Sequence, residues 1–225
     1  MRILGLTEPS GAPVLDYLLE HGADPYVASH HRGYAVLRPL EAALVEDEIT
    51  LSLLVEPVQD HLPPQQAERG RDSGLLLRPG EVPRVRQRVA AYVLVRSERG
   101  LLATEFSDRT AVPGRWGLPG GGMDPGETPT ESVLREVAEE TGQQVSLGEL
   151  RQIQTSHWVG RAPDGTVEDF HAVRLIYRAS CDLPTEPVVA DVGGTTESAR
   201  WLPLAQWRSV NWTVGWRRLL EAELD

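Results

Sequence analysis

The stretch from Gly120 to Gly142 is rich in glutamate and begins with three consecutive glycines. On an α-helix that advances about 100° per residue, Glu136, Glu139 and Glu140 share one side. Carboxylates this close repel one another, so we expect a cation to neutralise them. Every nearby ligand is oxygen, so the pattern favours a hard cation, Mg²⁺ with Mn²⁺ as a substitute, over zinc.

The helix that carries these glutamates can be bounded from the sequence. Thr128 is a good N-cap, Pro129 suits the first helical position, and Glu131 completes a Thr-x-x-Glu capping box. Gly142 supplies a left-handed stop. We expect four apolar residues to lie on the side away from the carboxylates and to pack on a sheet: Val133, Leu134, Val137 and Ala138.

A Glu-rich run is most often a solvated helix face. That interpretation does not account for the glycine loop, for Glu127 at the end of the loop, or for Arg135 among the acids. The pattern Gly-x5-Glu-x7-Arg-Glu-U-x-Glu-Glu-x-Gly-U, with U a bulky apolar residue, resembles the signature of the Nudix hydrolase family. The matching residues are Gly121, Glu127, Arg135, Glu136, Val137, Glu139, Glu140 and Gly142.

The resemblance implies an α/β fold, a Nudix-type α/β/α sandwich with a mixed sheet, from about residue 84 to the C-terminus. Gln143 departs from the family, which prefers an aliphatic residue there, and we expect Val145 to take over its packing role. This departure concerns the end of the helix and not the carboxylates.

The resemblance also implies a metal site and its ligands. Glu136, Glu139 and Glu140 would bind the metal, and the Gly120 carbonyl would be a further ligand. Glu127 would help through a metal-bound water. The metal would neutralise phosphate oxygens and activate a water for hydrolysis of a phosphoanhydride.

Arg135 is expected to hold a glutamate in place through a bidentate salt bridge. The general base stays open between Glu139, Glu140 and a glutamate from a later loop, as Nudix enzymes use. Glu197 is the best placed later glutamate and Glu168 the second, although a surface position is the commoner explanation for either. We assign no proton transfer to His157 or His171, and we place Trp116 and Trp158 in the core.

Composition sets outer limits on function. The formal net charge of −11 argues against non-specific binding to nucleic acid. The sequence has neither an apolar stretch of about 18 residues nor a signal peptide, so we expect a cytoplasmic protein without a membrane partner. All 22 basic residues are arginine, which suggests a GC-rich bacterial genome. Cys181 is the only cysteine, which excludes an intrachain disulfide.

The alternation of apolar and polar residues predicts the elements around the glutamate helix. We expect strands at 84–95, 101–106, 149–158, 170–179 and 200–202, a turn at 163–165, and one or two helices in 204–224.

Residues 1–60 form a separate small α+β region in this prediction, with a helix at 15–19 and strands at 35–37 and 49–55. Residues 61–83 are rich in proline and charge and are predicted to be a linker to a Nudix domain at 84–225. So small a region is marginal alone, so we expect it to dock on the catalytic domain or to form a homodimer interface.

Three functions fit these observations. The leading hypothesis is a metal-dependent hydrolase that splits a nucleoside diphosphate linked to another moiety, or a nucleoside triphosphate. The first rival is a non-catalytic Nudix regulator that senses such a nucleotide, which would not need three mutually repelling carboxylates. The second rival is an interaction protein whose N-terminal region is the working part.

Overall fold

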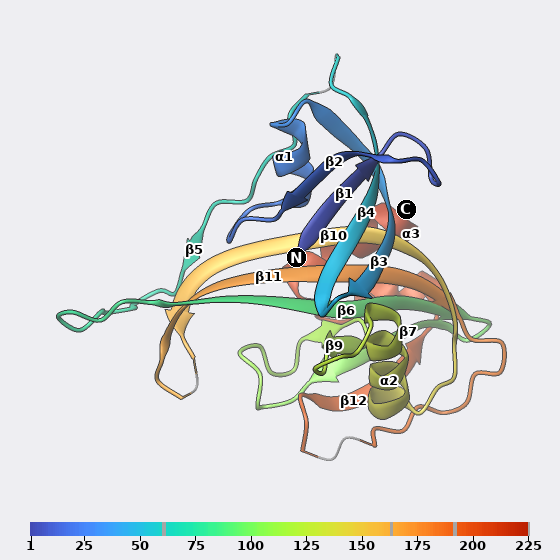
Figure 1. The fold of residues 1–225 in the computed structure, drawn as a ribbon. Helices are drawn as coiled ribbons and strands as arrows, with labels where there is room; N and C mark the ends of the chain where they lie inside the picture. The colour runs from blue at the N-terminus through green and yellow to red at the C-terminus, as the bar shows by residue number, and fades with distance from the viewer. Residues whose placement is uncertain (60–61, 163, 191–192, 225) are drawn as a thin grey trace. The chain divides into compact units, whose positions relative to one another are not determined.

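The computed structural model describes residues 1–59, 62–162, 164–190 and 193–224 (Figure 1). The chain divides into two compact units: Met1–Ala90 with Leu150–Ile176, and Ala91–Glu149 with Tyr177–Asp225. This division follows packing and not sequence order, and the predicted domain boundaries at residues 60 and 83 stay a prediction. Within the described ranges, no helix has both the length and the apolar character needed to cross a membrane.

The first unit contains a sheet with the order β2-β1-β4-β3. Its strands are β1 (Arg2–Leu6), β2 (Pro13–Leu18), β3 (Tyr34–Val45) and β4 (Glu48–Pro57). β1 runs parallel to β4, and the other two pairings are antiparallel. Glu46 and Asp47 both have positive φ, at 49° and 62°, as a tight hairpin turn between β3 and β4 requires. The predicted strands at 35–37 and 49–55 are confirmed as parts of β3 and β4.

The predicted helix at 15–19 is wrong, because this segment belongs to β2. Leu15 is buried while its neighbours Val14 and Asp16 are exposed, which is the period of a strand. Leu15 lies opposite Gly5 of β1, and a Cβ built on Gly5 would come within 2.9 Å of the Leu15 Cβ. Pairing with β1 therefore overrides the local helix pattern.

The helix of the N-terminal region is α1 (Pro25–His30), which begins after Asp24. One Asp24 oxygen accepts hydrogen bonds from the backbone of the first turn, and the other accepts one from Thr155 Oγ1 at 2.6 Å. Thr155 lies on β10 (Ser146–Arg161). The residues before 60 and the strand residues near 155 are therefore joined by side-chain contacts within the first unit.

The second sheet has the order β12-β7-β6-β11-β10-β5, with β8 paired to β7 and β9 to β6. Its other strands are β5 (Gly70–Arg71), β6 (Arg84–Ser97), β7 (Gly100–Phe106), β8 (Trp116–Gly117), β9 (Gly120–Gly122), β11 (Val167–Ser180) and β12 (Thr196–Leu202). The five strands predicted around the glutamate helix are confirmed, and each is longer than predicted. Pro163 of the predicted turn lies outside the described residues.

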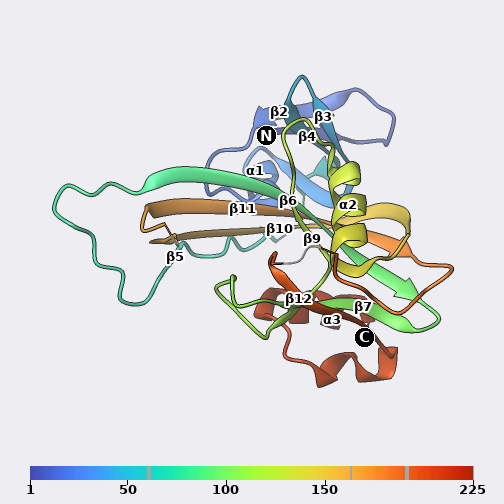
Figure 2. The same cartoon turned by 90° about the horizontal axis from the view of Figure 1, so that it is seen from below.

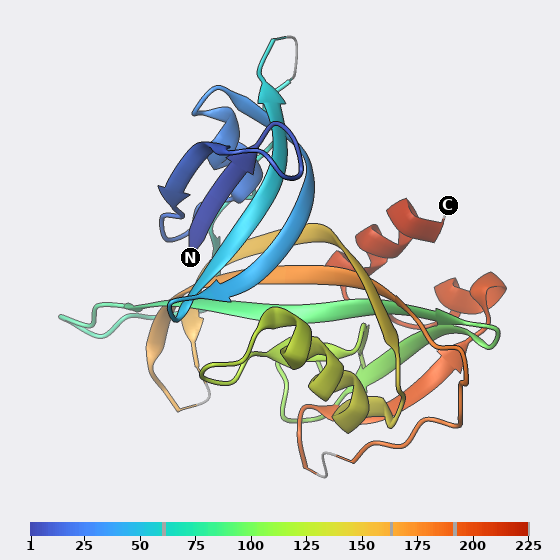
Figure 3. The ribbon, with the colours of Figure 1, turned by 45° about the vertical axis from the view of Figure 1, so that its right-hand side comes forward.

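Three helical segments belong to the second unit: α2 (Pro129–Thr141), the 3-10 helix η1 (Leu204–Ser209) and α3 (Val214–Leu224). The two helical segments predicted within 204–224 are thus η1 and α3. α2 and α3 lie on opposite faces of the strands of this unit (Figure 2 and Figure 3). The predicted α/β/α sandwich with a mixed sheet is therefore confirmed. Its buried core includes Leu101, Leu102, Val133, Val137, Leu219 and Leu220.

Candidate functional site

Local interactions fix both ends of α2, as the sequence predicts. The Thr128 hydroxyl accepts a hydrogen bond from the backbone N–H of Glu131, and the Glu131 carboxylate accepts one from the Thr128 N–H at 2.9 Å. Gly142 ends the helix with a φ of 66°. These contacts fix where α2 begins and ends, and so fix which of its residues lie beside the glycine loop.

One stripe of α2 packs into the second unit and includes a charged residue. Val133 and Val137 are fully buried, as predicted. Leu134 and Ala138 are exposed instead, so their predicted packing on the sheet is wrong. Glu140 is 6% exposed, because it follows Val133 and Val137 at helical spacing on the buried stripe.

The glycine loop lies too close to its neighbours for any side chain at two positions. Gly120 has a φ of +135°, and a Cβ there would overlap the Ala91 carbonyl oxygen. A Cβ on Gly121 would come within 2.5 Å of Glu136 Oε1. Glycine at these positions therefore lets the loop backbone approach the carboxylates of α2.

Arg135 joins the loop to the carboxylates. Its Nε and Nη2 donate to the two oxygens of Glu127 at 2.9 and 3.0 Å, the bidentate salt bridge predicted from the sequence. Its Nη1 donates to Glu136 at 3.2 Å and to Glu139 at 2.9 Å. Its Nη2 also donates to the Gly122 carbonyl at 3.2 Å. One guanidinium thus fixes three carboxylates and the loop backbone.

The charges of this cluster are mutually stabilised. Hydrogen bonds from Arg135 lower the pKa of Glu127 below its ordinary value, although burial opposes the shift. The hydrogen bond to Glu127 raises the pKa of Arg135 further above its ordinary value, with Glu136 and Glu139 adding to the effect. The carboxylate of Glu127 and the guanidinium are therefore both charged at neutral pH.

Glu140 is held by other partners. Its Oε2 accepts a hydrogen bond from the Gly120 N–H at 2.9 Å, and its Oε1 accepts one from the Thr196 hydroxyl of β12. Thr196 is a residue that the sequence reasoning missed. A signal was available, because Thr196 directly precedes Glu197 in the loop expected to reach the site.

The candidates for the general base differ in exposure and in their partners. The Glu139 side chain is 45% exposed, the most open of the glutamates that Arg135 binds. Glu197 is exposed and lies at the bulge of β12, one residue after Thr196. Glu168, the second choice, is paired with Arg86 at 3.1 Å within the first unit.

Trp116 and Gln143, which the sequence also singled out, are both buried. Trp116 is buried, as predicted, with the Arg200 guanidinium 4.1 Å from its ring centroid. Gln143 is buried at 3% exposure and fills its own position, whereas Val145, which was expected to take over that role, is only half-buried. Its amide is satisfied, since Oε1 accepts from the Thr185 N–H at 3.0 Å and Nε2 donates to Thr185 Oγ1 at 3.0 Å.

Comparison with known proteins points to one family. The family model described as NUDIX domain matches residues 86–220. A nucleoside triphosphatase NudI from Enterobacter sp. (strain 638) is 34% identical over 96 residues, which cover 41% of this chain and 68% of the relative. A NudI from Escherichia coli O1:K1 / APEC is 33% identical over 100 residues, with the same coverage.

Among solved structures, a MutT protein from Methanosarcina mazei Go1 is 20% identical, with a TM-score of 0.44. It covers 62% of this chain and 93% of its own. The family model spans more than half of the chain and includes the whole carboxylate cluster. The chain therefore belongs to the Nudix hydrolase family and is a pyrophosphohydrolase of that family.

Proposed function

We propose that this protein hydrolyses a phosphoanhydride bond of a nucleoside triphosphate, or of a nucleoside diphosphate linked to another moiety, with a divalent metal. The observation that carries the proposal is the cluster around Arg135, in which Glu127, Glu136 and Glu139 converge beside the glycine loop. A cluster of this kind brings together the oxygen donors that a hard cation needs.

The residues present fit Mg²⁺ or Mn²⁺. The donors are carboxylates and backbone carbonyls, and none is sulfur or imidazole. The space beside Glu136 Oε1 is kept free by Gly121, where a Cβ would lie 2.5 Å from that oxygen. We propose Glu136, Glu139 and Glu140 as the metal ligands, with the Gly120 carbonyl as a further ligand. Glu127 would contribute through a water held by that ion.

A bound divalent cation supplies charge neutralisation for the phosphate oxygens and increases the acidity of a water. Arg135 positions Glu136 and Glu139 through its Nη1, so its own role is to hold ligands in place. Glu140 has both oxygens in hydrogen bonds to Gly120 and Thr196, which sets the loop against the helix.

For the general base we favour Glu139 over Glu140. A base must accept a proton from water, and a half-exposed carboxylate is better placed to do so than a buried one that already accepts from two donors. Glu197 stays a candidate because Thr196, its neighbour on β12, contacts Glu140. Parallel pH–rate profiles of E139Q and E197Q would decide between them, since loss of the base removes the acidic limb of the profile.

Nucleoside triphosphates are the first substrates to test, because the NudI relatives are named as nucleoside triphosphatases. The full chain is incubated with nucleoside triphosphates and nucleoside diphosphate sugars, with Mg²⁺, with Mn²⁺ or with excess chelator. Products are separated by ion exchange and identified by mass. We expect metal-dependent release of phosphate or pyrophosphate, and essentially no product in chelator.

The matched control for E136Q and E139Q is E131Q. Glu131 lies on the same helix, but its carboxylate binds Thr128 in the capping box and not Arg135. We expect E131Q to retain turnover and the two site variants to lose at least about 100-fold. A parent protein that binds these nucleotides without splitting them, or that neither binds nor splits them, would overturn the proposed substrate class.

A further inference from the structure

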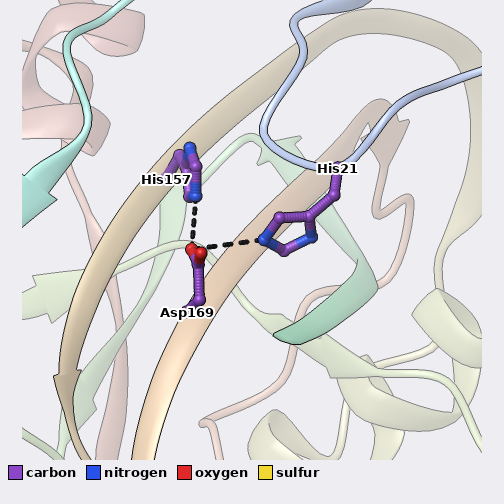
Figure 4. A group of neighbouring side chains, drawn as sticks. All are labelled: His21, His157 and Asp169. Carbon is purple, nitrogen blue, oxygen red and sulfur yellow. Dashed lines mark hydrogen bonds and ion pairs between the residues drawn. The ribbon is translucent and has the colours of Figure 1, made fainter. Parts of the chain in front are cut away.

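A second cluster of chemically active side chains lies in the first unit, and it shares no residue with the carboxylate cluster. His157 Nε2 and His21 Nε2 both contact Asp169 Oδ1, at 2.5 and 3.3 Å (Figure 4). One ligand atom from each of these three residues lies within 4.8 Å of the others. Two imidazoles therefore meet at one carboxylate oxygen.

The three residues come from separate parts of the chain. His157 lies on β10, Asp169 on β11, and His21 in the segment between β2 and α1. Gly22 allows His157 to approach this segment, since a Cβ on Gly22 would overlap the His157 ring at Nδ1. The fold therefore brings the histidines together with little freedom to separate.

The carboxylate of the cluster is held in one orientation. Arg69 Nη2 donates to Asp169 Oδ2 at 2.6 Å, which leaves Oδ1 for the two histidines. Burial raises the pKa of Asp169, but hydrogen bonds from His157 and His21 and the charge of Arg69 outweigh it and lower the pKa overall. A carboxylate that is anchored through one oxygen is prepared to bind a cation through the other.

A third histidine packs behind the cluster. His171 is fully buried, and its ring lies edge-on to those of His21 and His157, with centroids 5.5 and 6.0 Å apart. Gln87 Nε2 lies 2.9 Å from His171 Nδ1. Within the described part of the chain, His21 Nδ1 is buried without a hydrogen-bond partner. The other ring nitrogen of His21, Nε2, is the one that contacts Asp169, so the unpartnered Nδ1 does not itself face the carboxylate.

We propose that His21, His157 and Asp169 form a binding site for a divalent first-row transition metal, of which Zn²⁺ is the representative. Imidazole nitrogen and carboxylate oxygen suit these ions. Ligands about 2.0 to 2.1 Å from a tetrahedral zinc are about 3.3 Å from one another. The His21–Asp169 distance of 3.3 Å already has this value, and the His157–Asp169 hydrogen bond at 2.5 Å would lengthen on metal binding.

A pocket adjoins the two histidines of the cluster. His21 and His157 both line a cavity of about 440 Å³, together with polar side chains that include Gln66 and Arg32. Three protein ligands leave one position of a tetrahedral ion unfilled, and a water or a small anion would occupy it. The alternative is a purely structural clasp, in which the two histidines only hydrogen-bond to Asp169.

Zinc binding to the chelator-stripped full chain tests the proposal. Calorimetric titration with Zn²⁺ is done in excess Mg²⁺, which occupies hard oxygen sites. The variants are H21A, H157A and D169N. The side-chain oxygen of D169N could still accept from the two histidines, but its Nδ2 could not accept from Arg69, so this variant keeps only the histidine side of a clasp and lacks the charge that a metal site needs. Two controls are H31A, which removes another histidine of the pocket lining, and E136Q in the carboxylate cluster.

We expect one zinc per chain in the parent, in H31A and in E136Q, and at least about 10-fold weaker binding in H21A, H157A and D169N. Zinc should also raise the melting temperature of the parent but not that of D169N. Circular dichroism checks folding, and H21A decides the question if H157A fails to fold. Absence of zinc binding by the parent, or unchanged binding by folded H21A and D169N, would overturn the proposal. Neither result depends on nucleotide hydrolysis.

Discussion

Replacement of Arg135 by methionine should destabilise the metal-free protein at neutral pH by about 2–3 kcal/mol. Removing one partner of a fully buried ion pair costs about 3–5 kcal/mol, whereas an exposed pair contributes about 0–1 kcal/mol. Arg135 lies between these limits, since its side chain is 28% exposed and that of Glu127 is 13% exposed. R135M also removes the guanidinium whose Nη1 binds both Glu136 and Glu139, so these two carboxylates lose its positive charge.

Urea denaturation in excess chelator measures this loss directly, and a thermal melt should show a decrease of about 5–10 °C for a chain of this size. The control is R217M, which removes a cation from the exposed pair of Arg217 and Glu221 on α3. We expect that control to change the free energy of unfolding by less than about 0.5 kcal/mol. A cost for R135M as small as that of R217M would show that the cluster is not held by Arg135.

The loss should also depend on pH. Arg135 lowers the pKa of Glu127 below its ordinary value of 4.5, so the folded state binds the Glu127 proton less tightly than the unfolded state does. The stabilisation from the Glu127–Arg135 pair is complete above the pKa that Glu127 has in the unfolded chain. It is lost as the pH falls through the lower pKa that Glu127 has in the folded protein. The difference between parent and R135M should therefore be full at pH 7 and shrink in acid. A difference that stayed constant down to acidic pH would refute the electrostatic explanation.

Three further outcomes are expected. E140Q should keep the fold, because its amide can accept from Gly120 and donate to Thr196, while nucleotide turnover in a Mg²⁺ titration falls at least about 100-fold. Q143L should lower the free energy of unfolding by about 1 kcal/mol, measured in urea, because the Thr185 N–H loses Oε1 of the buried Gln143 as its acceptor, and turnover should not change. Residues 84–225 expressed alone should aggregate or change mass in light scattering, because the residues before 60 contact Thr155 and its strand; a soluble, monodisperse fragment would contradict this.

The sequence alone determined the glutamate helix and its ends. Thr128, Pro129, Glu131 and Gly142 act on backbone groups within a few residues of themselves, so their effect is local and can be predicted without the rest of the fold. The same holds for the β6–β7 hairpin, whose Ser97 pairs with Gly100 across a short turn. The sequence also predicted that Arg135 holds a glutamate through a bidentate salt bridge, and the structure identifies that glutamate as Glu127.

Tertiary structure decided how the glutamates of that helix differ. The spacing places Glu136, Glu139 and Glu140 on one side, but only packing against the core buries Glu140 and gives it Thr196 as a partner. That contact spans 56 residues of chain. A sequence pattern in the helix contains no information about which strand will be packed against it, because strand position depends on pairing across the whole sheet.

The same reason explains the two largest differences from the sequence prediction. The segment of Leu15 has a plausible helix pattern, and only pairing with β1 makes it a strand. His21 and Asp169 are separated by 148 residues, and neither carries a local signal of a shared site. Local capping and spacing thus determined the family and its carboxylate helix, whereas long-range strand pairing decided the fold of the N-terminal region and assembled the histidine cluster.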